Sequence, residues 1–178
     1  MNSNVEDIFK SKRLYFKFIT SNDTEKIINW RNNIRVRERF IFQETFTNSI
    51  HEKWLNERIQ GKGDVVQFII YENSTDKAIG SVYLRDIDKN HSKAEYGIFI
   101  GDDNAIGKGY GTESAKFIIK YAFKVLKLHK VMLRVFSDNI ASIRTNEKAG
   151  FKREAYLHDD VCINGEYKDI ILMAILNK

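Results

Sequence analysis

The chain has no proline and a single cysteine, Cys162, among its 178 residues. One thiol excludes an intramolecular disulfide, and Cys162 has no recognisable His or Asp partner motif, so we expect it to be inert. Without proline, every turn depends on Gly, Asn, Asp or Ser. No apolar run approaches the roughly 20 residues that cross a bilayer. These absences favour a cytoplasmic protein that binds no membrane.

Long runs of like charge and zinc-ligand spacings are also missing, so we expect neither a charged tail nor a bound metal. The net charge of +5 suits a polyanionic small ligand as well as nucleic acid. Because the basic residues are scattered and form no recognition motif, we expect no nucleic-acid partner. The composition, 43% hydrophobic and 30% charged, indicates one globular domain over residues 1–178. Residues 1–12 are polar and predict a flexible N-terminal lead, not a signal peptide.

Three glycines at alternate positions, Gly107, Gly109 and Gly111, stand between a strand-like run at 93–100 and a helix-like run at 112–125. Glycine permits positive φ and lets a ligand approach the backbone closely. Free N–H groups at a helix N-terminus favour phosphate. The spacing differs from the dinucleotide fingerprint G-x-G-x-x-G. We interpret the stretch as a diphosphate cradle; the alternative is a glycine-rich turn without a ligand.

The remaining periodicities predict a β-α-α-β-β-β-α-β-α-β-β order. That order indicates an α/β (α+β) fold, with a mixed, mostly antiparallel sheet and helices on both faces. The predicted strands are 14–19, 65–71, 78–85, 93–100, 131–136, 151–162 and 167–176, and the predicted helices are 22–31, 49–60, 112–125 and 140–148. Asn22 with Glu25 predicts a capping box, and Thr47 or Asn48 a second helix start, with Gly61 at that helix's end. Asn164-Gly165 predicts a hairpin turn.

The order and the motifs together resemble the GNAT acetyltransferase family, over nearly the whole chain from Arg13 to Leu176. Residues 106–111, Ile-Gly-Lys-Gly-Tyr-Gly, are similar to the family's pyrophosphate loop, Gln/Arg-x-x-Gly-x-Gly/Ala. Asn139 followed by Glu-Lys-Ala-Gly-Phe at 147–151 resembles its second signature, and residues 94–100 resemble its fourth strand. The most similar subgroup contains ribosomal-protein N-terminal, polyamine and aminosugar acetyltransferases.

The resemblance implies acetyl-CoA as cosubstrate and no metal. It places the phosphates on the loop, the pantetheine arm near Asn139, and the thioester oxygen near backbone N–H groups of a splayed fourth strand. The cofactor residues implied in this way are Ile98, Phe99, Ile100, Ile106, Gly107, Lys108, Gly109, Tyr110, Gly111, Thr112 and Asn139. Ile106 departs from the family's Gln/Arg, which leaves the phosphates to backbone amides and Lys108.

Two candidate catalytic groups follow on the helix at 140–148. Asn146 stands where many family members carry a tyrosine that protonates the departing thiolate, and asparagine supplies no such proton. Ser142 is the alternative acid, unless its hydroxyl only bonds its own helix.

Glu95 is the candidate base, because it lies on an otherwise apolar strand and burial raises the pKa of a carboxylate. The alternatives are an ion pair with Lys93 or Arg85, and a water chain acting as base.

For the acceptor, the first two helices carry Trp30, Arg31 and Arg35, then His51 and Trp54. Arg31, Arg35 and Arg39 would share one face if the first helix continued, and arginine forks bind phosphate oxygens. We expect the amine of a nucleotide-linked aminosugar or another small molecule. The alternatives are a peptide N-terminus, a polyamine, and, in another class, a CoA-binding module without turnover. The sequence does not fix the oligomeric state, and a homodimer is among the assemblies we allow for.

Overall fold

The computed structural model describes residues 9–178, and residues 1–8 lie outside that description. The predicted flexible lead falls mostly on the undescribed part. In the described part of this lead, residues 9–12, Phe9 packs against the main hydrophobic core. The hydroxyl of Ser11 donates to Oε1 of Glu113 at 2.7 Å.

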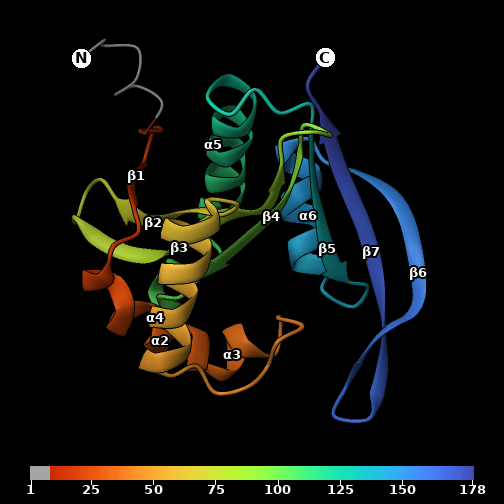
Figure 1. The fold of residues 1–178 in the computed structure, drawn as a ribbon, viewed down its shortest axis with the longest axis horizontal. Coiled ribbons are helices and arrows are strands. Elements are labelled where there is room, and N and C mark those ends of the chain that lie inside the picture. Colours follow the sequence, from red (N-terminus) through yellow and green to blue (C-terminus); the bar gives the residue numbers. More distant parts are fainter. Residues whose placement is uncertain (1–8) are drawn as a thin grey trace.

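A single seven-stranded sheet forms the centre of the molecule (Figure 1). Its strands, in spatial order, are β1 (Leu14–Phe18), β2 (Val66–Glu72), β3 (Lys77–Asp88), β4 (Lys93–Ile100), β5 (Lys130–Phe136), β7 (Glu166–Leu176) and β6 (Lys152–Ile163). The β4–β5 pair is parallel, and the other neighbours are antiparallel. The prediction of a mixed, mostly antiparallel sheet is confirmed.

Helices cover both faces of this sheet, because successive residues of a strand point to opposite sides. In β2, Phe68 and Ile70 join the core beneath α5 and α6, whereas Ile69 joins the core beneath α2 and α3. The helical elements are η1 (Ser21–Asp23), α2 (Thr24–Asn32), α3 (Ile34–Arg37), α4 (Asn48–Trp54), η2 (Leu55–Lys62), η3 (Asp103–Ala105), α5 (Tyr110–Lys124) and α6 (Ile140–Ala149). None of the helices within residues 9–178 has the length and hydropathy that crossing a bilayer requires.

The helix that follows Thr47 ends later than predicted. Thr47 is its N-cap, as expected, and accepts a hydrogen bond from the backbone N–H of Ile50. From Leu55 onward the chain winds as the π-helix η2, which takes more residues per turn. The left-handed residue that closes it is therefore Gly63 (φ +62°), not Gly61. Gly61 has a different role, since a Cβ there would lie 2.9 Å from the carbonyl oxygen of Asn56.

The first helix ends close to where the sequence predicted, so the continuation on which a shared arginine face depended does not occur. The capping box consists of Thr20 and Asp23, not of Asn22 and Glu25. Helix α2 stops at Asn32, and the side chain of Asn33 accepts from the N–H of Arg35 to start the new helix α3. Because the chain changes direction there, Arg31, Arg35 and Arg39 do not share one helical face.

Candidate active site

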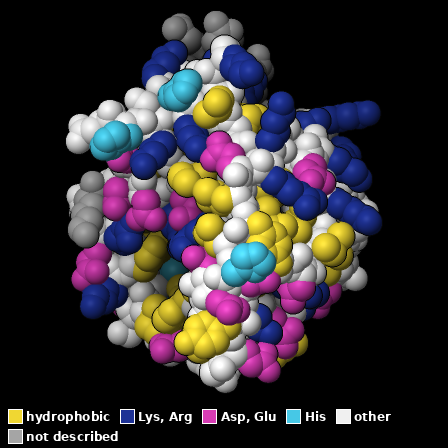
Figure 2. Space-filling view, turned by 90° about the vertical axis from the view of Figure 1, so that its right-hand side faces the viewer, with side chains coloured by type: hydrophobic (Ala, Val, Ile, Leu, Met, Phe, Trp, Pro, Cys, Tyr) yellow, Lys and Arg dark blue, Asp and Glu magenta, His cyan; other side chains and the backbone are white. Residues whose placement is uncertain are grey.

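A cavity of about 870 Å³ lies between the helices α2–α4 and the sheet, and it reaches through the middle of the sheet to the glycine loop and α6. Residues from α2, α4, β3, β4, β5, α6 and the loop before α5 line it. Figure 2 shows the molecule from the β6–β7 side, with a hollow left of the centre whose walls carry hydrophobic and basic side chains. Among residues 9–178 there is no cluster of His, Cys, Asp and Glu that could hold a metal ion.

The opening through the sheet arises because β4 and β5 separate. They pair at three positions, from Lys93–Lys130 to Glu95–Met132, and no further along the described strands. The edge of β4 beyond Glu95 therefore has free peptide groups, and Ile98, Phe99 and Ile100 line the cavity there. This is the segment in which the family resemblance implied N–H donors for a developing oxyanion.

The glycine loop lies at one end of this opening. Gly107 (φ +76°) and Gly109 (φ +78°) have the positive φ that the motif predicted, and Gly109 is the N-cap of α5. The first backbone N–H groups of a helix have no partner within it, so those of Tyr110, Gly111 and Thr112 are available to an anion. Gly111 serves packing instead of a left-handed turn, because a Cβ there would lie 3.2 Å from Cγ2 of Thr145 on α6.

Two side chains of the loop, those of Ile106 and Lys108, differ in how they relate to the cavity. Ile106 lines the cavity and is 47% exposed, so its side chain is free to contact a ligand. Lys108 is not part of the described lining; its carbonyl oxygen accepts from Nη1 of Arg13 at 2.8 Å. Arg13 also forms an ion pair with Glu113, at 2.7 Å, in the first turn of α5. This brace left no signal in the sequence, since its partners lie about a hundred residues apart.

Helix α6 presents Asn139 and Ser142 to the cavity. Asn139 caps the helix by accepting from the N–H of Ser142 at 3.2 Å. Asn146 is only 1% exposed and stands outside the described lining. Its Nδ2 donates to the carbonyl oxygen of Ser142 at 2.9 Å and to Oγ of Ser142 at 3.3 Å. Of the two predicted groups near the thiolate, the structure thus brings Ser142 to the cavity and Asn146 behind it.

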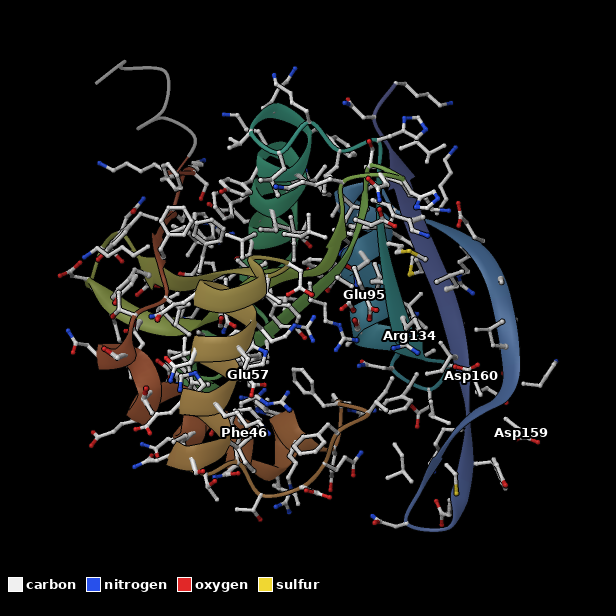
Figure 3. The ribbon with its side chains drawn as sticks, viewed as in Figure 1. Phe46, Glu57, Glu95, Arg134, Asp159 and Asp160 are labelled. Atoms are coloured by element: carbon white, nitrogen blue, oxygen red, sulfur yellow. The ribbon has the colours of Figure 1, made fainter. Side chains whose placement is uncertain are left out.

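Glu95 lies in the cavity wall between two arginines. Its Oε1 is 2.6 Å from Nη2 of Arg85 and 3.7 Å from Nε of Arg134. Figure 3 shows Glu95 and Arg134 side by side, with Phe46 on the helical side of the same space. The carboxylate is 18% exposed, but its surroundings are charged and not apolar as the strand sequence suggested. The arginine partner that the sequence analysis named as the alternative is present.

Of the predicted acceptor residues, four line the cavity: Arg31, Arg35, His51 and Trp54. The imidazole of His51 is buried, which lowers its pKa despite the opposing charge of Asp23. It stacks on Trp54 and its Nδ1 is 3.1 Å from Oγ1 of Thr24. Trp30 is outside the described lining; it packs against Phe99.

Gly101 explains why Trp30 is a packing residue. A Cβ at Gly101 would lie 2.1 Å from Cγ of the indole, so the ring rests directly on the backbone after β4. The tryptophan predicted to stack on a ligand is thus held against the sheet.

Several cavity residues were not found from the sequence. Tyr83 lies across from Gly97 in the β3–β4 register, and a Cβ at Gly97 would meet its hydroxyl oxygen at 2.3 Å. Burial raises the pKa of Tyr83, against the opposing charges of Arg85 and Arg31. Arg134 and the aromatic side chains after α3 were missed as well. The alternation of polar and apolar residues along a strand predicts which side chains share a face, but it does not predict which residues of other segments they contact.

The chain was compared with known proteins and structures. The family model "Acetyltransferase (GNAT) domain" matches residues 13–152. The chain is 36% identical over 121 residues to probable N-acetyltransferase YjcK of Bacillus subtilis, which covers 68% of this chain and 66% of that protein. It is 32% identical over 149 residues to spermidine N(1)-acetyltransferase of Escherichia coli, covering 81% and 75% of the two chains.

A solved structure extends the likeness to nearly the full length. The crystal structure of spermidine N-acetyltransferase from Vibrio cholerae in complex with CoA and spermine has a TM-score of 0.86 at 27% identity, covering 93% of this chain and 96% of that chain. Another structure of that enzyme is described as dodecameric and has a TM-score of 0.78.

Proposed function

The chain belongs to the GNAT family of acetyltransferases, and we propose that it transfers the acetyl group of acetyl-CoA to the primary amine of a small molecule. The family makes it an acyltransferase of the N-acetyltransferase class. The observation that carries the proposal is the separation of β4 and β5 beside a glycine loop at a helix N-terminus. One cavity joins these features to a second wall made by α2–α4, so two substrates have room to meet.

The cofactor end of the cavity fits acetyl-CoA. A Cβ at Gly107 would meet no described atom within 4 Å, so the backbone there is bare to a diphosphate. The N–H groups that start α5 would bind its oxygens, and the side chain of Asn139 would contact the pantetheine arm. Free N–H groups on β4 near Ile98 would stabilise the thioester oxygen as it gains charge. Acetyl-CoA, when bound, supplies the activated acetyl group.

Glu95 is our candidate for the proton-accepting group. An amine attacks only after it has lost its proton, and the carboxylate lies on β4 just before the strands separate. Arg85 and Arg134 hold Oε1, which leaves the other oxygen for the amine or for an intervening water. A water chain without Glu95 as base remains the competing proposal.

Ser142 is our candidate donor to the departing thiolate, and Asn146 its positioning residue. Since Asn146 Nδ2 donates to Oγ of Ser142, the serine hydroxyl hydrogen is directed elsewhere, and the serine borders the cavity. In this proposal Asn146 does not contact the thiolate, as the sequence had suggested it would, but orients the hydroxyl of Ser142.

For the acceptor, the relatives support a polyamine better than a nucleotide-linked aminosugar, because the E. coli and V. cholerae enzymes are spermidine acetyltransferases. The cavity itself favours a different amine. Among the described residues its lining has one carboxylate, Glu95, against a set of cations: Arg31, Arg35, Arg39, Arg58, Arg85, Arg134, Arg144 and Lys148. Carboxylates beside the cavity pair with Arg35, Arg39 and Arg58, but none of the described carboxylates pairs with Arg31, and this charge would attract an amine that also carries a negative charge.

Release of free thiol from acetyl-CoA, measured with a panel of amines, tests the proposal. The panel contains spermidine, glucosamine, an alanine-led peptide and phosphoethanolamine, and the product is identified by mass as singly acetylated. We expect thiol release that depends on the amine. If acetyl-CoA binds by calorimetry but no amine accelerates thiol release over the blank, the chain is a CoA-binding module and the proposal fails.

The predictions of cytoplasmic location, of no nucleic-acid partner and of a homodimer stay predictions. The dodecameric V. cholerae enzyme supports a search for higher assemblies as well as a dimer. Sedimentation of the purified chain with and without acetyl-CoA would measure the assembly directly.

A further inference from the structure

Arg31 has an unusual environment for a positive charge. Its guanidinium carbon lies 3.4 Å from the ring centre of Phe40 and 5.1 Å from that of Phe46. The residue is only 8% exposed, yet it borders the cavity. Its hydrogen bond to protein is a long one, from Nη2 to the carbonyl oxygen of Phe42 at 3.4 Å. No carboxylate of residues 9–178 forms an ion pair with it.

A buried charge without a counter-charge is costly, and aromatic faces compensate only part of that cost. The pKa of Arg31 is lowered to about 10, chiefly by burial, with the charge of Arg85 adding to the lowering and Tyr83 opposing it. The guanidinium is still charged at neutral pH. Its planar donors therefore face the cavity with a positive charge that the described protein does not neutralise.

Arg85 and Tyr83 face the same volume from the sheet. Tyr83 and Arg85 are alternate residues of β3, so their side chains leave the strand on the same face, and both line the cavity that Arg31 borders from α2. The Nη2 of Arg85 is held by Glu95, and its Nε is 3.8 Å from Oδ2 of Asp86, but this Nε is buried and has no hydrogen-bond partner among the described residues. The guanidinium groups of Arg31 and Arg85 and the hydroxyl of Tyr83 thus supply hydrogen-bond donors, and the Nε–H of Arg85 donates to no described atom.

The other arginines that line the cavity from the helical side, Arg35, Arg39 and Arg58, are paired with carboxylates. Arg35 pairs with Asp103 at 2.7 Å and donates to the carbonyl oxygen of Ile100, and Arg39 contacts Asp138 at 3.4 Å. Arg58 pairs with Asp64 and Asp86 at 2.9 and 2.7 Å. On the helical wall, Arg31 therefore has no carboxylate partner among the described residues, and on the sheet the Nε of Arg85 has no hydrogen bond.

We infer that the acceptor amine carries a carboxylate or phosphate group, and that this group binds between Arg31 and Arg85, with the hydroxyl of Tyr83 as a further donor. The inference rests on the proposed acetyl transfer and adds the chemical class of its acceptor. Arginine forks match the paired oxygens of both groups. Bound there, the anion would supply the missing counter-charge of Arg31, and the rest of the acceptor would extend along β4 toward Glu95.

Matched pairs of amines test the inference. Phosphoethanolamine is compared with ethanolamine, 6-aminohexanoate with hexylamine, and spermidine is the cationic reference, all by thiol release at saturating acetyl-CoA. We expect the anionic member of at least one pair to have kcat/KM at least about tenfold higher than its match, and higher than spermidine. The pair with the larger preference distinguishes a phosphate from a carboxylate.

The variant Arg31→Gln should remove that preference while the affinity for acetyl-CoA is retained, and Arg31→Lys should keep part of it. Arg153→Gln is the matched control, since Arg153 pairs with Glu147 outside the cavity. Equal kcat/KM within both pairs, or spermidine as the better substrate, would overturn the inference and leave the acetyl transfer intact.

A binding measurement separates this inference from the proposed function. Inorganic phosphate is titrated by calorimetry into the wild-type chain saturated with CoA, so that the glycine loop is already filled. We expect binding that is lost in Arg31→Gln and retained in Arg153→Gln. If no amine is acetylated, this titration still decides the anion site: absence of phosphate binding in the wild-type chain overturns it.

Discussion

Gly107 and Gly165 have similar left-handed backbone conformations, with φ of +76° and +84°, and a Cβ on either would meet no described atom within 4 Å. In the absence of a ligand, replacing either glycine by alanine should therefore cause the same backbone strain. They differ in where they lie, since Gly165 is in the turn between β6 and β7 and Gly107 borders the cavity.

We expect Gly107→Ala and Gly165→Ala to lower stability equally, by about 1–2 kcal/mol each. Only Gly107→Ala should weaken acetyl-CoA binding, by at least about tenfold, because the new methyl group occupies the space of the diphosphate. Thermal denaturation and calorimetry measure the two effects. Equal acetyl-CoA affinity in both variants would show that the loop does not cradle the diphosphate.

Glu95 offers a second comparison at this scale. Glu95→Gln keeps an oxygen for Arg85 but cannot take a proton, so we expect kcat to fall by about 10²-fold or more. Glu154→Gln is the control, because Glu154 also pairs with a cation, Lys130 at 2.6 Å, but lies on β6 away from the cavity. A Glu95→Gln variant with kcat within a few-fold of the wild type would assign the proton to water.

At the scale of elements, the N-cap residue of helix α6 combines a structural and a chemical task. Asn139 caps the helix and also borders the cavity. Aspartate caps as well as asparagine does, but it has no amide N–H to donate. Substitution can therefore separate the two tasks.

Asn139→Ala should lower stability by about 1 kcal/mol, whereas Asn139→Asp should keep the stability of the wild type. Both should weaken acetyl-CoA binding if the amide contacts the pantetheine arm. Thr47→Ala removes the cap of α4 and serves as the control, with a similar loss of stability and unchanged affinity. Wild-type affinity in Asn139→Asp would restrict Asn139 to capping.

The elements themselves were largely predictable, because their signals are local. The strand 93–100 and the start of α6 after Asn139 match the sequence prediction, and Asn164 and Gly165 both have positive φ, as a tight hairpin turn requires. The relation between Arg31 and Arg35 was not predictable, because a shared face required one continuous helix, and the cap at Asn33 starts a separate helix instead.

The assembled site was harder to predict than its parts. Gly97 reads as an ordinary strand residue, and its need for glycine appears only when Tyr83 lies across from it. Similarly, Arg31 differs from other helical arginines only through Phe40 and Phe46, which reach it from the chain after α3. Contacts between distant segments leave no periodic signal in the sequence.

At the scale of the whole molecule, Glu113 ties the start of the described chain to α5. It accepts from Oγ of Ser11 at 2.7 Å, and from the backbone N–H and the side chain of Arg13 at 2.8 Å. Burial alone would raise the pKa of Glu113, but these hydrogen bonds outweigh it and the pKa is lowered. A lowered pKa stabilises the fold above the unfolded-state pKa, and this stabilisation is lost as the pH falls through the folded-state pKa.

We therefore expect the wild-type chain to lose thermal stability in acid, starting near the unfolded-state pKa of about 4.3. Glu113→Gln should be less stable at neutral pH and should lose less on acidification. Glu166→Gln is the control, because the carboxylate of Glu166 is exposed on β7 and its ion pair is with Lys168, two residues further along the same strand. The melting temperature is measured between pH 7 and pH 3. If it falls by the same amount in the wild type and in Glu113→Gln, the brace at Glu113 does not stabilise the fold.

The central claim is that one cavity receives the cofactor through the gap between β4 and β5 and the acceptor from the side of α2–α4. A crystal structure of the chain with CoA and the best anionic amine tests it most directly. The account predicts the diphosphate on the N–H groups that begin α5, the thiol beside Ile98, the amine nearest Glu95 and the anion at Arg31. A diphosphate bound elsewhere, or an acceptor that leaves Arg31 without a partner, would contradict it.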